Sequence, residues 1–128
     1  MIVLDASILI AFLNATDAHH SSAKDILSRS YEEDLGANSM TLAEVLVGPI
    51  RAGKSDEAQS AIEDLAIEEL PFPVNTATKL ASLRASSGLK MPDCCVVLAA
   101  EESRASVATF DDQLARVARE RGLTVHTR

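Results

Sequence analysis

The hydrophobic pattern of the chain begins with a short continuous apolar run and then changes to helical spacing. Residues 2–4 (IVL) are apolar without interruption, which predicts a strand buried on both faces of a parallel sheet. Asp5 ends this run, and from Ser7 to Leu13 the apolar residues recur at helical spacing, with Ser7 placed to cap the helix. A charged residue therefore follows a buried strand directly, where ligands bind in open α/β sheets.

The rest of the first half predicts three more helices and two short strands. The helical segments are DAHHSSAKDILSR, SMTLAEVLVGPIRAG and SDEAQSAIEDLAIEEL, and the strands are residues 35–38 and the segment IEELPF. Asp17 is placed to cap the first of these helices. Thr41 and Glu44 have the spacing of a capping box at the start of the second, which Gly48–Pro49 is expected to interrupt.

The second half repeats this alternation with clearer signals. Helices are predicted over VNTATKLASLRASSG, which Gly88 ends, over LKMPDCCVVLAAEES, where Pro92 suits the first turn, and over DDQLARVARERG. SVATF and LTVHT are the last two strands. Helices that alternate with short strands predict a three-layer α/β/α sandwich with a mainly parallel sheet of four or five strands. We expect one domain over residues 1–128.

Composition adds constraints on the core and on the cellular location. Hydrophobic residues make up 47% of the 128 residues but aromatic residues only 3%, so the core must consist mainly of Leu, Val, Ile and Ala. The apolar start has no positive residue before it, contains Asp5 and is too short to span a bilayer. We therefore expect a cytoplasmic protein without a membrane partner. Cys94 and Cys95 are expected to pack a helix, and the pair His19–His20 to be solvated.

The net charge of −7 is unevenly distributed along the chain. Residues 1–70 contain 4 Lys or Arg against 13 Asp or Glu, whereas residues 71–128 contain 8 against 6. This asymmetry allows one basic surface for a polyanion on an acidic protein, although ordinary solvated helix faces explain the charges equally well. The cations expected on that surface are Lys79, Arg84, Lys90, Arg104, Arg116 and Arg119.

Four carboxylates are predicted at the starts of helices or the ends of strands. Asp5 follows the first strand, Glu44 and Asp93 lie in first helical turns, and Asp111 lies at the junction in ATFDDQL. Each has a structural explanation, because helix N-termini favour negative charge. If the four converge, they cannot all be ionised without a counter-charge, and an all-oxygen ligand set favours Mg²⁺ or Mn²⁺ over Zn²⁺. Carboxylate-bound Mg²⁺ activates water and neutralises a phosphoryl oxygen.

Four segments resemble the acidic segments of PIN-domain ribonucleases, specifically the VapC toxins of bacterial toxin–antitoxin pairs. They are IVLDASILIAFL, TLAEVLVG, LKMPDCCVVLAA and ATFDDQLARVARERGLTV, and they span nearly the whole chain in the right order. The resemblance implies a parallel sheet with the first strand central, a Mg²⁺-dependent endoribonuclease, a homodimer, and an antitoxin that inhibits by binding near the active site.

The resemblance also implies roles for individual residues. Asp5 and Asp93 are then the direct metal ligands, and Glu44 and Asp111 complete the catalytic site. Two hydroxyl residues, Ser7 and Thr109, support the acids from the second layer.

The adjacent acids Asp111 and Asp112 are expected to divide two roles. Thr109 and Asp112 stand three residues apart, so Asp112 is expected to cap the helix while Asp111 faces the metal.

Other classes of protein fit the sequence less well. A haloacid-dehalogenase-like phosphotransferase has a second Asp two residues after the first, where this chain has Ser7. A receiver domain has a phosphorylated Asp mid-chain and an essential Lys near its end, and a dinucleotide-binding fold has a glycine-rich loop after the first strand. One alternative stays open, a PIN-like module that binds RNA or protein without cleaving it.

Overall fold

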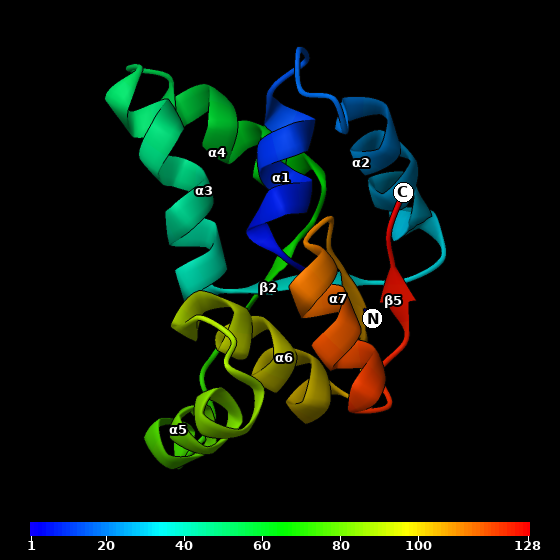
Figure 1. Ribbon diagram of the computed structural model, residues 1–128. Coiled ribbons are helices and arrows are strands. Elements are labelled where there is room, and N and C mark those ends of the chain that lie inside the picture. The colour runs from blue at the N-terminus through cyan, green and yellow to red at the C-terminus, as the bar shows by residue number, and fades with distance from the viewer.

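A parallel β-sheet with helices on both faces forms the framework of this computed structural model (Figure 1). The structure describes the backbone of residues 1–128 and the side chains of residues 1–29 and 31–128. The strands are β1 (Ile2–Leu4), β2 (Leu35–Asn38), β3 (Glu68–Leu70), β4 (Ser106–Ala108) and β5 (Val125–His126). The helices are α1 (Ala6–Leu13), α2 (His20–Leu27), η1 (a 3₁₀ helix, Ser28–Tyr31), α3 (Ser39–Arg51), α4 (Ser55–Asp64), α5 (Thr76–Ser87), α6 (Met91–Ser103) and α7 (Asp112–Glu120).

The sheet has the strand order β3-β2-β1-β4-β5, and all four neighbouring pairs are parallel. The predicted three-layer fold and the central position of the first strand are therefore confirmed. Val3 of β1 lies opposite Gly36 of β2 and Val107 of β4. All residues of β1 are fully buried, as expected for a strand covered on both faces.

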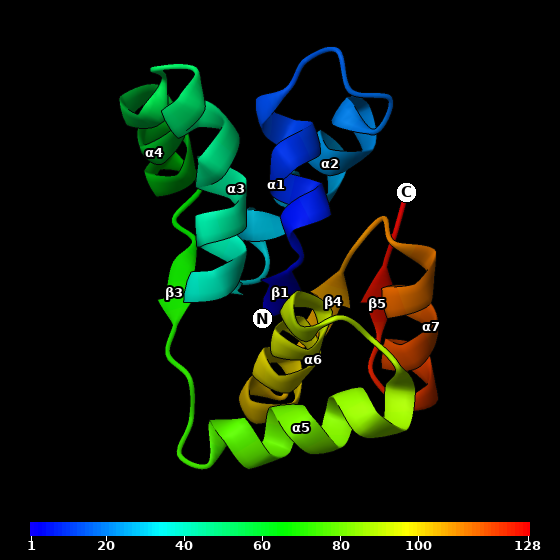
Figure 2. The same ribbon diagram turned by 60° about the vertical axis from the view of Figure 1, so that its left-hand side comes forward.

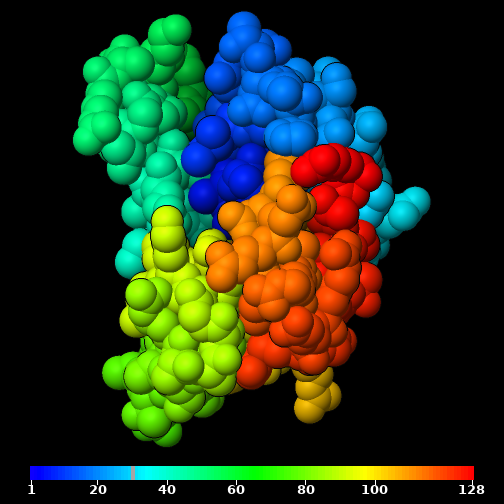
Figure 3. Space-filling view, in the orientation of Figure 1, coloured from blue at the N-terminus to red at the C-terminus, as the bar shows by residue number. Residues whose placement is uncertain are grey.

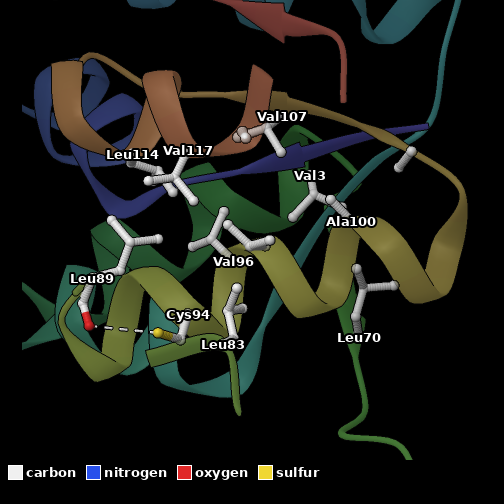
Figure 4. Packing of buried hydrophobic residues seen from close by; sticks show 13 residues of the cluster. Val3, Leu70, Leu83, Leu89, Cys94, Val96, Ala100, Val107, Leu114 and Val117 are labelled. Atoms are coloured by element: carbon white, nitrogen blue, oxygen red, sulfur yellow. Dashed lines mark hydrogen bonds between the residues drawn. The ribbon is translucent and has the colours of Figure 1, made fainter. Parts of the chain in front are cut away.

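Alternate residues of the strands pack into two separate cores. Ile2 and Leu4 belong to a cluster with α1, α2 and α3, whereas Val3 belongs to a cluster with α5, α6 and α7. Figure 2 shows these two groups of helices on opposite sides of the sheet. Figure 4 shows the second cluster, in which α6 contributes Val96 and other buried residues to the layer under β1 and β4.

The two cysteines pack inside the protein, as predicted. Cys94 and Cys95 are buried, and the Cys94 Sγ–H donates to the Leu89 carbonyl at 3.6 Å (Figure 4). Burial raises the pKa of both thiols, so they stay protonated at neutral pH. Both side chains therefore act as small core residues of α6.

Three helix starts differ from the predictions. Asp5, rather than Ser7, is the N-cap of α1, and His19, rather than Asp17, is the N-cap of α2. Asn38 is the N-cap of α3, and its Oδ1 accepts a hydrogen bond from the Thr41 N–H at 2.9 Å. In all three cases the chain enters the helix at a different residue from the one with the best capping pattern.

The α3 helix also differs in its length and in the position of Glu44. Because α3 starts at Ser39, Glu44 lies in its second turn, and the expected capping box with Thr41 does not form. The helix continues through Pro49 to Arg51, and the carbonyls of Gly48 and Pro49 accept hydrogen bonds from residues 52 and 54. Pro49 removes one N–H near the helix end but leaves these last carbonyls paired, so the expected interruption is wrong.

The two histidines before and at the start of α2 are partly buried, which corrects the prediction of a solvated pair. The His19 ring stacks on Phe110, and the His20 ring stacks on Phe12. His20 Nδ1 also lies 2.9 Å from the Ala11 carbonyl oxygen. Within the described residues, no helix has the length and apolar character needed to cross a membrane.

Candidate acidic site at the carboxyl edge of the sheet

Three polar residues lie side by side where the central strands end. Leu4 pairs with Ala108, and Val3 pairs with Gly36, so continuing the register places Asp5 between Thr109 and Asn38. The alternation of side chains along the strands places all three on the face covered by α6. Asp5, Asn38 and Thr109 are the buried polar residues of this edge.

Asp5 is held by two hydroxyl groups. Its side chain is buried, and Oδ2 accepts hydrogen bonds from Ser7 Oγ at 2.8 Å and from Thr109 Oγ1 at 2.7 Å. Both hydroxyls are themselves fixed, because Ser7 Oγ accepts from the Phe110 N–H and Thr109 Oγ1 accepts from the Asp111 N–H. No described residue donates a hydrogen bond to Asp5 Oδ1. The network therefore orients one carboxylate oxygen and leaves the other without a protein donor.

Asp93 and Glu44 carry the electrostatic signature of a shared acidic site. The first turn of α6 holds Asp93, and α3 holds Glu44. Burial, followed by the charges of Asp5, Asp111 and Glu44, raises the pKa of Asp93 to about 6, although Lys90 acts in the opposite direction. Burial and the Asp5 charge also raise the pKa of Glu44. The structure therefore brings Asp5, Glu44 and Asp111 within electrostatic range of Asp93.

Asp111 has the capping role that the sequence pattern predicts for Asp112, and its role toward a metal stays a prediction. It is the N-cap of α7, and its Oδ1 accepts from the Leu114 N–H at 2.8 Å. Asp112 is 97% exposed, and its Oδ1 lies 3.9 Å from Arg128. The prediction that Asp112 caps the helix is wrong, because α7 starts at Asp112 and the residue half inside the helix is Asp111.

The side chains of this edge fit a hard divalent cation held by few protein ligands. The donors are carboxylate oxygens, which suit Mg²⁺ or Mn²⁺, and the raised pKa values show that their charges lack compensation. Among the described residues, no three His, Cys, Asp or Glu side chains are grouped closely enough to form a complete metal cage. Mg²⁺ does not need one, because it commonly binds through one or two carboxylates and retains several waters.

Asn38 is a buried polar residue of this edge that was not among the predicted site residues. It is 1% exposed and is the last residue of β2, where continuing the register places it beside Asp5. Its Oδ1 caps α3, whereas Nδ2 has no partner among the described residues, and the same holds for Thr41 Oγ1. The signal that points to it is a polar residue at the end of the predicted strand 35–38, in the segment LGANS.

The expected basic surface is partly neutralised. Lys79 pairs with Glu102 at 2.7 Å, and Arg116 pairs with Glu120 at 3.2 Å. Arg84 donates to the Leu89 carbonyl at 2.6 Å. The two ion pairs reduce the charge that Lys79 and Arg116 can offer to a polyanion, whereas Arg84 keeps its charge but has one donor occupied.

An apolar groove runs from the acidic site between α1 and α3. It has a volume of about 250 Å³, and its walls include Ile10, Val45 and Glu44. A second hollow of about 490 Å³ adjoins it and extends to Ala58 of α4. Figure 3 shows the surface hollowed between the dark blue start of the chain and the teal helix α3. One carboxylate of the site is thus also part of an apolar groove.

A parallel sheet with the first strand central and acids at its carboxyl edge is the arrangement expected for a PIN domain. The chain belongs to the PIN domain family, whose model matches residues 2–120. No curated protein is significantly similar to it in sequence.

Solved structures share the fold over nearly the full chain. A toxin–antitoxin complex from Klebsiella pneumoniae is similar with a TM-score of 0.75 and 21% identity, covering 90% of each chain. VapBC2 from Rickettsia felis, bound to a DNA fragment from the promoter, has a TM-score of 0.73 and 17% identity over 99% of this chain and 98% of that one. The sarcin–ricin loop cleaving toxin VapC20 from Mycobacterium tuberculosis has a TM-score of 0.75 and 16% identity over 91% and 94%.

Proposed function

We propose that this protein is a Mg²⁺-dependent endoribonuclease that hydrolyses RNA phosphodiester bonds and acts as the toxin of a toxin–antitoxin pair. The observation that carries this proposal is the buried Asp5 carboxylate at the carboxyl edge of the sheet, which Ser7 and Thr109 orient through Oδ2 and whose Oδ1 has no donor among the described residues. Four acids held together at one sheet edge are costly for a protein without a counter-ion. A divalent cation and a phosphodiester substrate account for that arrangement.

In this proposal the four acids have different tasks. Asp5 and Asp93 bind Mg²⁺, or Mn²⁺ as a substitute, and Glu44 and Asp111 complete the negative site. When bound, the metal lowers the pKa of a water and neutralises charge on a phosphoryl oxygen. Ser7 and Thr109 hold Asp5 Oδ2, so that Oδ1 faces the cation in a fixed orientation. The carboxylates that stay unprotonated accept the proton from the attacking water.

The toxin assignment rests on the fold and on the groove beside the acids. Toxin–antitoxin complexes from two bacteria have this fold. The groove walls combine Ile10 and Val45 with Glu44, which suits a protein segment that offers apolar side chains next to a positive one. An antitoxin bound there would cover the acidic site. We also propose that residues 1–128 form one domain, that it forms a homodimer, and that it acts in the cytoplasm.

A cleavage assay with controlled metal content tests the enzymatic proposal. Purified protein should cleave RNA with Mg²⁺ or Mn²⁺ and lose this activity in excess EDTA. Asp5→Asn should be inactive, whereas Asp25→Asn, which changes an exposed acid on α2, should cleave like the original protein. Undiminished cleavage in excess chelator would exclude the metal mechanism. RNA binding without any cleavage would instead support the non-catalytic alternative.

The toxin and dimer assignments need separate measurements. Expression of the chain should stop growth, and coexpression of a small protein encoded beside it should restore growth. Ile10→Glu, which places a charge in the groove outside the four acids, should keep the toxicity and weaken that rescue if the partner occupies the groove. Sedimentation at micromolar concentration should show a dimer, and a monomer would contradict that part of the proposal.

A further inference from the structure

His19 and Phe110 form a stacked pair of rings beside the acidic site. Their centroids lie 4.7 Å apart, and the angle between the rings is 24°. His19 comes from the turn before α2, and Phe110 comes from the turn between β4 and α7. Phe110 lies between Thr109 and Asp111, and its N–H donates to Ser7 Oγ at 3.1 Å. The stack is therefore attached to the hydrogen-bond network that holds Asp5.

A second pair of the same kind provides a comparison within the chain. Phe12 and His20 have ring centroids 6.5 Å apart, and His20 Nδ1 contacts the Ala11 carbonyl oxygen. Packing between α1 and α2 explains that pair. The ring nitrogens of His19, in contrast, have no hydrogen-bond partner among the described residues, and both the His19 and Phe110 rings remain partly exposed.

Charge contributes little to holding RNA on this protein. The net charge is −7, and the site itself is acidic. Lys79 and Arg116 form ion pairs with Glu102 and Glu120. Counter-ion release from phosphates therefore provides only part of the affinity. Proteins that bind single-stranded RNA commonly obtain the remainder from bases stacked on aromatic or histidine rings.

We propose that the His19–Phe110 stack binds one nucleobase of a single-stranded RNA, next to the phosphodiester at the acidic site. This inference rests on the proposed ribonuclease function and specifies where the substrate is held. Phe110 packs against the core and supports the partly exposed His19 ring, on which the base stacks. Base stacking at this place orients the adjacent phosphate toward Asp5 and Asp93.

A fluorescent base provides a direct test of stacking. The probe is a short single-stranded oligouridine that contains one 2-aminopurine, whose fluorescence falls when the base stacks on a ring. The protein is the full chain with Asp5→Asn, which prevents cleavage, in the presence of Mg²⁺. We expect binding to quench the probe. His19→Leu and Phe110→Leu should each weaken binding about tenfold and remove the quenching.

Two further variants separate stacking from a general loss of structure. Phe110→Tyr keeps a ring and should restore both affinity and quenching. Phe12→Leu removes the ring of the other pair and should leave both unchanged. Unchanged binding and quenching in both His19→Leu and Phe110→Leu would overturn the proposal. An equal loss of binding in Phe12→Leu would also overturn it, because the effect would then not belong to this stack.

The cleavage assay distinguishes the failure of this inference from the failure of the proposed function. With Asp5 intact, Phe110→Leu should raise KM more than it lowers kcat. If the original protein cleaves RNA and Phe110→Leu has the same KM, the base site is wrong and the ribonuclease function stands. If the original protein quenches the probe but never cleaves RNA, the base site stands and the ribonuclease function is wrong.

Discussion

The floor and the rim of the acidic site are constructed differently. The floor consists of Asp5 with Ser7 and Thr109, and two hydroxyl donors fix its carboxylate. The rim consists of Glu44 and Asp93, to which no described residue donates a hydrogen bond. Burial and neighbouring charge raise the pKa of both rim carboxylates. The fold thus fixes the position of the floor acid, while the rim acids are held at an electrostatic cost.

This difference implies different responses to mutation. Floor changes that remove hydrogen bonds from buried groups should reduce both activity and stability. Changes in the rim should reduce activity but increase stability, because they remove an uncompensated charge. The following experiments test this contrast.

The largest effect is expected for Asp5→Asn in the floor. Asn keeps the shape and can still accept both hydroxyl bonds, but it removes the charge that we propose binds the metal. RNA cleavage should fall at least about 100-fold, roughly 2.7 kcal/mol of transition-state stabilisation, while the melting temperature changes little. Single-turnover cleavage and thermal melting measure the two quantities. An Asp5→Asn protein that remains toxic in cells would place the site elsewhere.

A smaller effect on cleavage and a clear effect on stability are expected for Thr109→Val. The change leaves the Asp111 N–H without its acceptor and removes one donor to the buried Asp5. The stability should fall by about 1–3 kcal/mol, and cleavage should fall about tenfold. Thr124→Val, at an exposed position, serves as the matched control in chemical denaturation. Equal stability of the two variants would show that the floor hydroxyl contributes nothing.

At the α7 start, charge and capping can be separated. Asp111→Asn removes the charge but keeps a good cap, so cleavage should fall about tenfold with little change in melting temperature. Asp111→Ala should additionally cost about 1 kcal/mol of stability through the lost cap. If Asp111→Asn cleaves RNA normally, Asp111 is only a cap.

In the rim, Asp93→Asn should make the protein more stable, and the gain should depend on pH. The pKa of Asp93 in the folded protein is raised to about 6, so folding favours its protonated form. The stability that this preference contributes is present below roughly pH 4 and is lost as the pH rises through about 6. Asp93→Asn should therefore match the original protein near pH 4. Because Asp93 is partly screened by solvent, the gain above roughly pH 7 should be only about 1 kcal/mol.

Thermal melting in EDTA over this pH range measures the difference. Added Mg²⁺ should then raise the melting temperature of the original protein and not that of Asp93→Asn. An Asp93→Asn protein that is less stable at neutral pH would contradict the proposed electrostatic cost.

The smallest effect is expected for Asp112→Asn. Its side chain is 97% exposed and only 3.9 Å from Arg128, which is a weak surface pair. Stability should change by less than about 0.5 kcal/mol, and cleavage should not change. A larger loss of cleavage than in Asp111→Asn would shift the fourth site acid by one residue.

The sequence predicted the sheet and its acids because those signals are local. A buried apolar run followed by Asp5 defines both the central strand and the site edge. The capping residues were harder to predict. Ser7, Thr41 and Asp112 have the sequence patterns of N-caps, but none of them caps its helix in the structure. Asp5 and Asn38, which lie at the ends of strands, are the N-caps instead, because each helix starts directly after its strand.

Long-range contacts explain the remaining errors. The sequence around His19 predicts a surface residue, but in the structure its ring stacks on Phe110. The two residues are 91 positions apart in the sequence. The pairing of Lys79 with Glu102 likewise depends on how α5 packs on α6. No local pattern contains these contacts.

The register between β1 and β4 has a consequence for how the protein is made. Asp5 is held by Thr109, which follows it by 104 positions, and its backbone N–H donates to Ala108. The ribosome synthesises β1 first, but β1 lies between β2 and β4 in the sheet. It therefore lacks one of its two neighbours until β4 has been synthesised. Chains that end before residue 109 lack the floor of the site. The acidic site is therefore complete only when synthesis of the chain is almost finished.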